Sequence, residues 1–303
     1  MQNSAPAADM QLRKNPSPGP AQIAAPKIWT APCIVISAVK SYNLLIEHQC
    51  PQCGAPATLT ETDRLFTCEF CRVKSYLMPG DCFHYRLPDT APQGKELIYF
   101  PYWRFKGMLF SCVSDTIREK FIDVSHQAIE STCFPHSLGF RSQTLKLRFV
   151  SPEDEGRFLP PRQSFGQVLQ IFEERFQSQL PKPVYHQAHI GENVSLIYAP
   201  YYLKGQLYDA VLNEPTAREV PEDIENMMAG DARPNWHLEF LSTLCPTCGW
   251  DLEGEKDSLV LLCRNCNSAW QPGKDRLQKL KFSHIAATDD QDIIYLPFWR
   301  IKT

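Results

Sequence analysis

The chain has 303 residues, of which 43% are hydrophobic and 21% are charged, the composition of an ordinary globular protein. Its 25 prolines against 14 glycines, together with 11% aromatic residues, favour short strands and constrained loops and argue against an all-helical bundle. The formal net charge of −3 lacks the strong positive balance of a general nucleic-acid-binding protein.

The N-terminal residues 1–32 contain six prolines among Ala, Ser, Asn and Gln, with too little apolar material to offset chain entropy, and they predict a disordered tail. This terminus has no apolar segment behind its charges, and no later stretch reaches the roughly 18 apolar residues of a membrane helix. We therefore expect a cytoplasmic protein without a membrane span. In that reducing compartment, paired cysteines are better read as metal ligands than as disulfide partners.

Eight cysteines form two matching sets of CxxC pairs. Fourteen residues separate the pairs in each set, and both sets open with the same pattern, CPQCG and CPTCG. A CxxC turn presents two sulfurs to one metal ion, and a hairpin of about this length brings two such turns together around a tetrahedral Zn²⁺. Because cysteine fills all four positions, no position is left for a catalytic water, and we expect two structural zinc ions. The predicted ligands are Cys50, Cys53, Cys68 and Cys71 in the first zinc ribbon, and Cys245, Cys248, Cys263 and Cys266 in the second.

These CPxCG…CxxC segments resemble the rubredoxin-type ribbon of general transcription factor B and of many bacterial zinc-ribbon proteins. The resemblance covers about 30 residues in each copy and implies a ribbon fold with a bound metal. Zinc ribbons serve transcription, ribosomes, enzymes and scaffolds alike, so the resemblance does not select a function. Four further cysteines lie outside the pairs, and we expect them to be buried small apolar residues: Cys33, Cys82, Cys112 and Cys133.

An aromatic motif follows each ribbon, as IYFPYWRFK at 98–106 and as IYLPFWRIK at 294–302. Its proline lies 30 positions after the last cysteine in the first case and 31 in the second, which indicates a duplicated unit of ribbon plus aromatic strand. A third copy without cysteines, IYAPYYLKG, occupies 197–205. The middle of the chain is therefore predicted to be an internally repeated β-rich core. Pairing of ribbons with this motif also resembles uncharacterised bacterial zinc-ribbon proteins.

The aromatic motif has two interpretations. It predicts either a strand whose aromatic side chains face the core, with Arg and Lys on the solvent side, or an exposed platform that stacks bases and contacts phosphates. The buried strand is the commoner arrangement and the one we favour. The candidate interaction residues of the second interpretation are Tyr102, Trp103, Arg104, Lys106, Phe298, Trp299, Arg300 and Lys302.

One helix is predicted over residues 164–180, because Ser164 and Gln167 form a capping-box pattern and apolar residues follow at helical spacing up to Pro181. A shorter helix is expected over residues 221–228. Residues 142–150 alternate apolar and basic side chains as in a half-exposed strand.

The resulting fold class is β-rich α+β, with two zinc ribbons that flank, and are attached to, a repeated antiparallel β core with one or two helices. The expected divisions are a tail at 1–32, the first ribbon at 33–80, the core at 81–235, the second ribbon at 236–273, and a terminal β segment at 274–303 that repeats the 81–106 aromatic strand.

From these features we expect a non-enzymatic zinc-binding adaptor or assembly protein that binds another protein. Eight zinc-bound thiolates and two Zn²⁺ ions would lower the net charge to about −7, which disfavours nucleic acid as the partner. A nucleic-acid-binding regulator that uses the ribbons and aromatic strands is the first alternative, and an enzyme of unknown type is the second.

Overall fold

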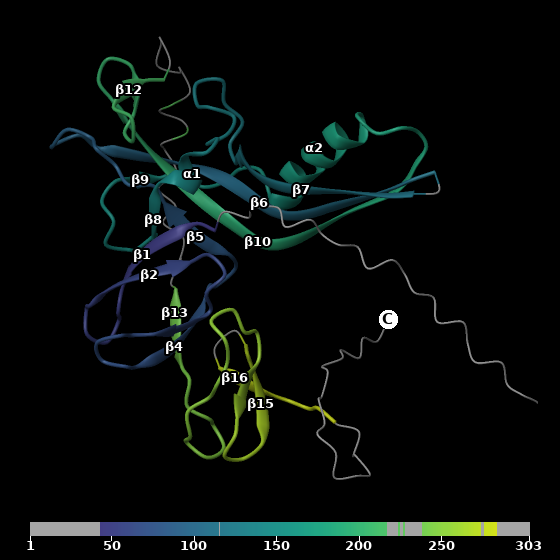
Figure 1. The fold of residues 1–303 in the computed structure, drawn as a ribbon. Coiled ribbons are helices and arrows are strands. Elements are labelled where there is room, and N and C mark those ends of the chain that lie inside the picture. Colours follow the sequence, from purple (N-terminus) through teal and green to yellow (C-terminus); the bar gives the residue numbers. More distant parts are fainter. Residues whose placement is uncertain are drawn as a thin grey trace, which may run out of the picture. The chain divides into compact units, whose positions relative to one another are not determined.

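The computed structural model describes residues 43–114, 116–216, 224, 227, 238–273 and 276–283 (Figure 1). All of them belong to one compact unit that spans residues 41–303. The predicted tail, most of the predicted 221–228 helix and the 294–302 aromatic copy lie outside the described residues. Ile224 and Met227, from the predicted helix, are helical and buried.

The described residues form sixteen strands and two helices, α1 (Arg141–Thr144) and α2 (Phe165–Gln177). Ten strands make one sheet: β1 (Leu45–Gln49), β2 (Pro56–Thr60), β5 (Phe83–Arg86), β6 (Leu97–Val113), β7 (Thr116–Gln127), β8 (Lys146–Phe149), β9 (Arg157–Phe158), β10 (Val184–Leu203), β11 (Leu207–Asp209) and β12 (Glu214–Pro215). Two three-stranded sheets complete the set: β13 (Glu239–Ser242) with β4 (Lys74–Met78) and β3 (Leu65–Thr67), and β14 (Leu261–Cys263) with β15 (Ser268–Pro272) and β16 (Leu277–Leu280).

The fold is β-rich as predicted, but its large sheet is mixed and not antiparallel. Parallel pairs join β1 to β8, β5 to β10 and β6 to β9. The two strands of each pair are far apart in the sequence. Between them the chain leaves the sheet and then enters it again in the same direction. Strand alternation indicates which face of a strand is buried, but it does not indicate the direction of a distant neighbour.

Strands β6 and β10 form the centre of the sheet, and β7 continues it at the other edge of β6 (Figure 1). Gly107 lies where β6 and β10 approach most closely, because a Cβ atom on this residue would lie 2.3 Å from the carbonyl oxygen of Ile190. The pairing register shifts next to this point, between Gly191 and Asn193. The absence of a side chain at Gly107 is therefore required for continuous pairing through the irregularity.

The first two copies of the aromatic motif lie on β6 and β10 and pair with each other. Tyr99 is opposite Pro200, Phe100 is opposite Ala199, and Pro101 is opposite Tyr198. The motif tyrosine of each copy thus faces the motif proline of the other. The equivalent hydroxyl groups of Tyr102 and Tyr201 are also hydrogen-bonded, at 3.1 Å. A local two-fold arrangement thus relates the two copies. Duplication of the whole ribbon-plus-strand unit stays a prediction, because its second copy includes residues 284–303, which lie outside the described residues.

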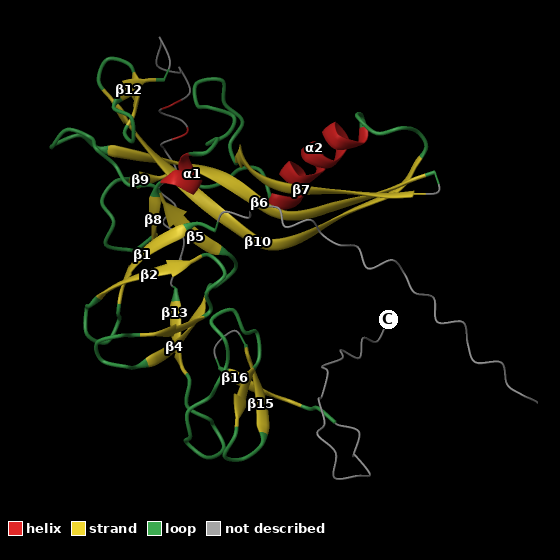
Figure 2. Ribbon diagram, in the orientation of Figure 1, coloured by secondary structure: helices red, strands yellow, loops and turns green. Residues whose placement is uncertain are grey.

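Ser164 is the N-cap of α2, and both hydrogen bonds of the predicted capping box are present. Val168 and Phe172 are buried against Phe105 and Ile122, so the apolar stripe of the helix covers one face of the long strands (Figure 2). The predicted strand over 142–150 is shorter than expected. Residues 142–144 belong to α1, and β8 follows with Leu147 buried and its basic neighbours exposed.

A cluster of charged side chains lies inside the protein, between β6 and the loop that follows β2. Arg104 and Lys106 are 1% and 0% exposed, and Glu61 is 2% exposed. Both cations contact the carboxylate of Glu61, with Lys106 Nζ at 2.8 Å, and Arg104 also donates to Asp123 Oδ1 at 2.9 Å. Lys106 further donates to Asn43 Oδ1 at 2.6 Å. Two positive charges thus meet two negative charges, and no net charge is buried.

The expectation that Arg104 and Lys106 mark a solvent-facing side of the strand is therefore wrong. Burial by itself would lower the pKa of Arg104, but Glu61 and Asp123 more than offset this effect and raise the pKa above its ordinary value. The charged face of β6 is covered by the loop after β2, while the aromatic face is covered by α2.

We expect Glu61→Gln to lower the free energy of unfolding by about 3 to 5 kcal/mol, because it leaves two buried cations with one carboxylate. Urea denaturation measures this loss. Glu47→Gln is the matched control, since Glu47 pairs with Arg148 at 3.1 Å at a partly exposed site and its removal should cost about 1 kcal/mol or less. Equal losses for the two variants would contradict a special role for the buried cluster.

Candidate metal centres

The first cysteine set is assembled by strands β1 to β4. Cys50 follows β1, Cys68 follows β3, and Cys53 and Cys71 lie in the two turns. The sulfur of Cys50 is 3.7 Å from that of Cys71, and the sulfur of Cys53 is 3.6 Å from that of Cys68. Within the first turn, the carbonyl of Cys50 accepts a hydrogen bond from Gly54 N, whose φ of 71° favours glycine.

The second set repeats this geometry with residues 195 positions later. Cys245 and Cys266 are 3.6 Å apart between sulfurs, and Cys248 and Cys263 are 3.5 Å apart. Gly249 N donates to the carbonyl of Cys245, as Gly54 N does to that of Cys50. The second turns also correspond, because Arg72 and Asn267 both adopt positive φ.

Both sets fit a tetrahedral metal ion. The four sulfurs of each set lie within 4.8 Å of one another. A Zn–S bond of about 2.3 Å implies a sulfur-to-sulfur edge of about 3.8 Å, close to the separations observed. A disulfide needs about 2.05 Å, so the thiols are free. Each set can therefore hold a metal ion, and zinc and iron are both metals that four tetrahedral thiolates suit.

Backbone groups assist ionisation of the thiols. The backbone N–H of Cys71 lowers the pKa of Cys68 to about 6, against the opposing effect of burial. Burial also opposes ionisation of Cys245, but the backbone N–H groups of Thr247 and Cys248 lower its pKa to about 6. Within each set these N–H groups favour one thiolate, whereas burial and the neighbouring thiols, despite opposing backbone N–H groups, raise the pKa of Cys71 to about 12 and that of Cys263 to about 11. Thiolates are the form that binds zinc, so a bound cation is needed to ionise a whole set.

The two ribbons pack on each other within the described residues, whereas the sequence predicts that they flank the core. Strand β13, which leads into the second ribbon, pairs with β4 of the first. The backbone N–H groups of Arg64 and Leu65 both donate to the carbonyl of Lys256, and the hydroxyl of Tyr76 donates to that of Ser258. A shared apolar cluster contains Leu65 and Tyr76 together with Leu252, Leu261 and Trp270.

The aromatic candidates for interaction are placed inside the protein where the structure describes them. Tyr102, Arg104 and Lys106 are buried, and Trp103 is partly buried with its Nε1 donating to the carbonyl of Gln163 at 2.8 Å. We do not propose a partner contact through these side chains. The corresponding candidates in the last copy lie outside the described residues: Phe298, Trp299, Arg300 and Lys302.

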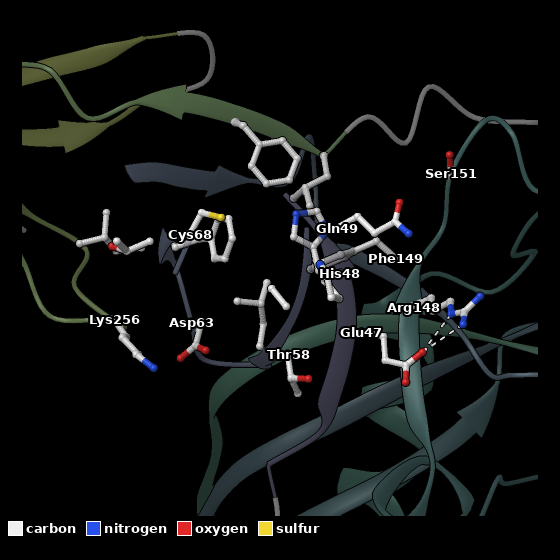
Figure 3. Close-up of a pocket in the computed structure, with 18 of the residues that line it drawn as sticks. Glu47, His48, Gln49, Thr58, Asp63, Cys68, Arg148, Phe149, Ser151 and Lys256 are labelled. Atoms are coloured by element: carbon white, nitrogen blue, oxygen red, sulfur yellow. Dashed lines mark hydrogen bonds and ion pairs between the residues drawn. The ribbon is translucent and has the colours of Figure 1, made fainter. Parts of the chain in front are cut away.

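An open groove lies between β1, β2, β8 and the ribbon loops (Figure 3). Acidic and basic residues both line it, and some of them are paired: Glu47 with Arg148 at 3.1 Å, and Arg86 with Asp154 at 2.8 Å. At its inner side, the ring of His48 stacks on Phe240 at 5.1 Å, and burial lowers the pKa of His48. The groove therefore has mixed charge and does not direct a set of catalytic groups at one point.

Two features of the surface were not predicted from the sequence. The second ribbon exposes apolar side chains on one face, and Asp81, Cys82 and His84 lie together at the start of β5. Cys82 was expected to be a buried apolar residue, but it is partly exposed and contacts His84. In the sequence, the spacing Asp-Cys-x-His at residues 81–84 is the signal that could have indicated this cluster. Cys82 and His84 are two positions apart, and such residues share one face of a strand.

No family model, no curated protein and no solved structure matches this chain. Within the described part of the chain, the helices are too short or too polar to cross a membrane. The function is therefore inferred from the sites themselves.

We expect the protein to retain two zinc ions per chain after dialysis against metal-free buffer. Cys53→Ser and Cys248→Ser should each lose one, because three thiolates remain where four are needed. Elemental analysis of folded protein measures both counts. Cys112→Ser is the control, since Cys112 lies on β6 outside both sets, and it should retain two. Full zinc content in either ligand variant would contradict the assignment of that site.

Proposed function

We propose that this protein is a non-enzymatic, cytoplasmic zinc-binding adaptor or assembly protein, with two structural Zn²⁺ ions, that binds a protein partner through the second ribbon. The observation that supports the proposal is an exposed face on this ribbon, called here the outer ribbon face and defined by Leu244, Asp251, Glu253 and Leu262. The zinc ions would stabilise the ribbon that presents this face.

Strand pairing places these four residues on one side of the ribbon. Leu244 is opposite Asp251, and Glu253 is opposite Leu262. Asp251 and Glu253 are two positions apart in an extended segment that forms both bridges, so they point to the same side. Leu252, between them, points to the other side and is fully buried. Leu244 and Leu262 are each 53% exposed, which leaves apolar surface in the solvent on a rigid support.

This apolar surface is not a requirement of the ribbon fold. The first ribbon has Gln49 and Thr67 at the positions that correspond to Leu244 and Leu262, 195 residues earlier. The second ribbon also exposes Trp250 and Leu259 close in sequence to this face. A pair of ribbons with the same metal geometry thus differs in its surface, and exposed apolar groups with a polar rim are typical of protein-binding surfaces.

The charges around the outer ribbon face select the kind of partner. Asp251, Glu253, Glu255 and Asp257 lie on or next to the face, and the exposed Arg264 pairs with Glu253 at 2.7 Å. An excess of acidic groups repels phosphate and attracts basic side chains. The partner that fits is a protein segment with apolar side chains flanked by Lys or Arg.

We expect the double variant Leu244→Ser with Leu262→Ser to weaken partner binding by about 10- to 100-fold, because two central apolar contacts are removed. The partner is first isolated from the native cells as a stoichiometric complex, and its affinity for each variant is then measured with purified components. Ile117→Ser is the matched control, since Ile117 is an apolar residue on β7 that is even more exposed, at 68%, and lies far from the ribbons in sequence.

Two results would contradict the proposal. The double variant could bind the isolated partner as tightly as the wild type does, or the wild type could bind random duplex or single-stranded oligonucleotides below micromolar concentration at physiological salt with a steep salt dependence. The second result would favour a nucleic-acid-binding regulator.

A further inference from the structure

A third group of potential metal ligands lies between the first ribbon and the large sheet. Asp81 and Cys82 end the loop after β4, and His84 is the second residue of β5. Asp81 Oδ1 is 3.0 Å from His84 Nε2, and Cys82 Sγ is 3.7 Å from the same nitrogen. One ligand atom from each residue lies within 4.8 Å of the other two, as in the two four-cysteine sets.

The local fold holds these three side chains together. Phe83 and Tyr85 point into the core, so the alternation of the strand turns Cys82 and His84 to the other face. His84 is fixed by its place in β5, where it is opposite Leu196 of β10 and its carbonyl accepts from Val150 N at 3.0 Å. The backbone N–H of Cys82 donates to Asp81 Oδ1 at 2.6 Å, which holds the carboxylate beside the strand.

We propose that Asp81, Cys82 and His84 form a third metal site, which binds Zn²⁺ or a similar divalent cation through three side chains and leaves one position open to water. The metal–ligand bonds of zinc, about 2.0–2.1 Å to O and N and about 2.3 Å to S, imply tetrahedral edges of about 3.3 Å between O and N and about 3.6 Å between S and N. The observed separations of 3.0 and 3.7 Å lie close to these values.

The surroundings support an ion at this point. A small cavity of about 10 Å³, enough for one water-sized sphere, is lined by the three ligands and by apolar side chains that include Phe149, Val150 and Leu238. His84 is buried at the inner end, whereas the side chain of Asp81 is 73% exposed. The open position therefore faces solvent. With three donors in place of four, this site should exchange its metal more readily than the ribbons do.

A cysteine nucleophile activated by His84 fits the geometry less well. In such a site the carboxylate orients the histidine through one ring nitrogen while the thiol contacts the other. Here Asp81 and Cys82 both approach Nε2. Side-chain atoms of Asp81, Cys82 and His84 that gather around one point are arranged as the ligands of a cation are.

The test is a Co²⁺ titration of full-length protein whose two ribbons are already loaded with zinc. We expect one further Co²⁺ ion per chain, with the visible absorption of a thiolate-bound tetrahedral ion. Cys82→Ser should abolish the thiolate charge-transfer band, and Asp81→Asn should weaken binding at least about 10-fold. Because the side chain of Asp81 is exposed, this second variant should keep the native fold. Cys112→Ser and Asp89→Asn are the controls, and both should titrate as the wild type does.

Equilibrium dialysis against Zn²⁺ gives a second count, with three ions expected in the wild type and two in Asp81→Asn at a concentration that saturates the ribbons. The proposal is overturned if the wild type binds no third ion, or if it binds one that Cys82→Ser and Asp81→Asn both retain. If no third ion binds, the three residues form only an ion pair with a neighbouring thiol. If both variants retain a third ion, that ion lies elsewhere. Neither result depends on the partner of the second ribbon.

Discussion

The buried pairing of Glu61 with Arg104 and Lys106 joins the first ribbon to the central strand of the sheet. Glu61 lies between the two cysteine pairs, and the cations lie on β6, 43 and 45 residues later. Since Asp123 of β7 completes the charge balance, the cluster links three segments in one register. The loop that carries Glu61 covers one face of β6, and α2 covers the other. These contacts hold β6 in place, and β10, β7 and β9 pair with it.

Such a cluster is a source of specificity more than of net stability. Desolvation of four charged groups offsets most of their mutual attraction, but any packing that separates them leaves a buried charge without a counterion. An alternative register of β6 would move its cations to the opposite face, away from Glu61. We therefore expect the contacts of the loop that carries Glu61 to favour the native register of β6 over alternatives.

Local signals predicted local features well. The spacing of the CxxC pairs indicated both cysteine sets, the pattern at Ser164 indicated the capping box of α2, and alternation indicated that Leu147 is buried. Burial of Arg104 and Lys106 could not be read in this way, because it depends on a carboxylate contributed by a distant loop. The parallel strand pairs and the packing of one ribbon on the other also depend on contacts between remote segments. The cluster of Asp81, Cys82 and His84 is local, and its spacing was available in the sequence.

The two ribbons show how one metal geometry serves two purposes. Strands β1 and β2 of the first ribbon are part of the ten-stranded sheet, so this ribbon contributes Glu61 and a sheet edge to the core. The second ribbon attaches through β13 and keeps an apolar face with acidic neighbours in the solvent. The two ribbons therefore differ in strand pairing and in outward side chains, while the cysteines and the turn glycines keep the same local backbone geometry in each case.

The mutual pairing of the first two aromatic motifs has a consequence for the order of events during synthesis. Tyr102 pairs with Ile197, 95 residues further along the chain, so the centre of the sheet has high contact order. At about 5–20 residues per second, the ribosome needs about 5 to 20 s to supply β10 after β6 has emerged. During this interval β6 has an open hydrogen-bonding edge and an aromatic surface, both of which favour aggregation. The four cysteines of the first ribbon lie close in sequence, so this ribbon can close around a metal ion before β10 is made. The supply of that ion would then determine whether Glu61 is already in place against β6 while this strand lacks its partner.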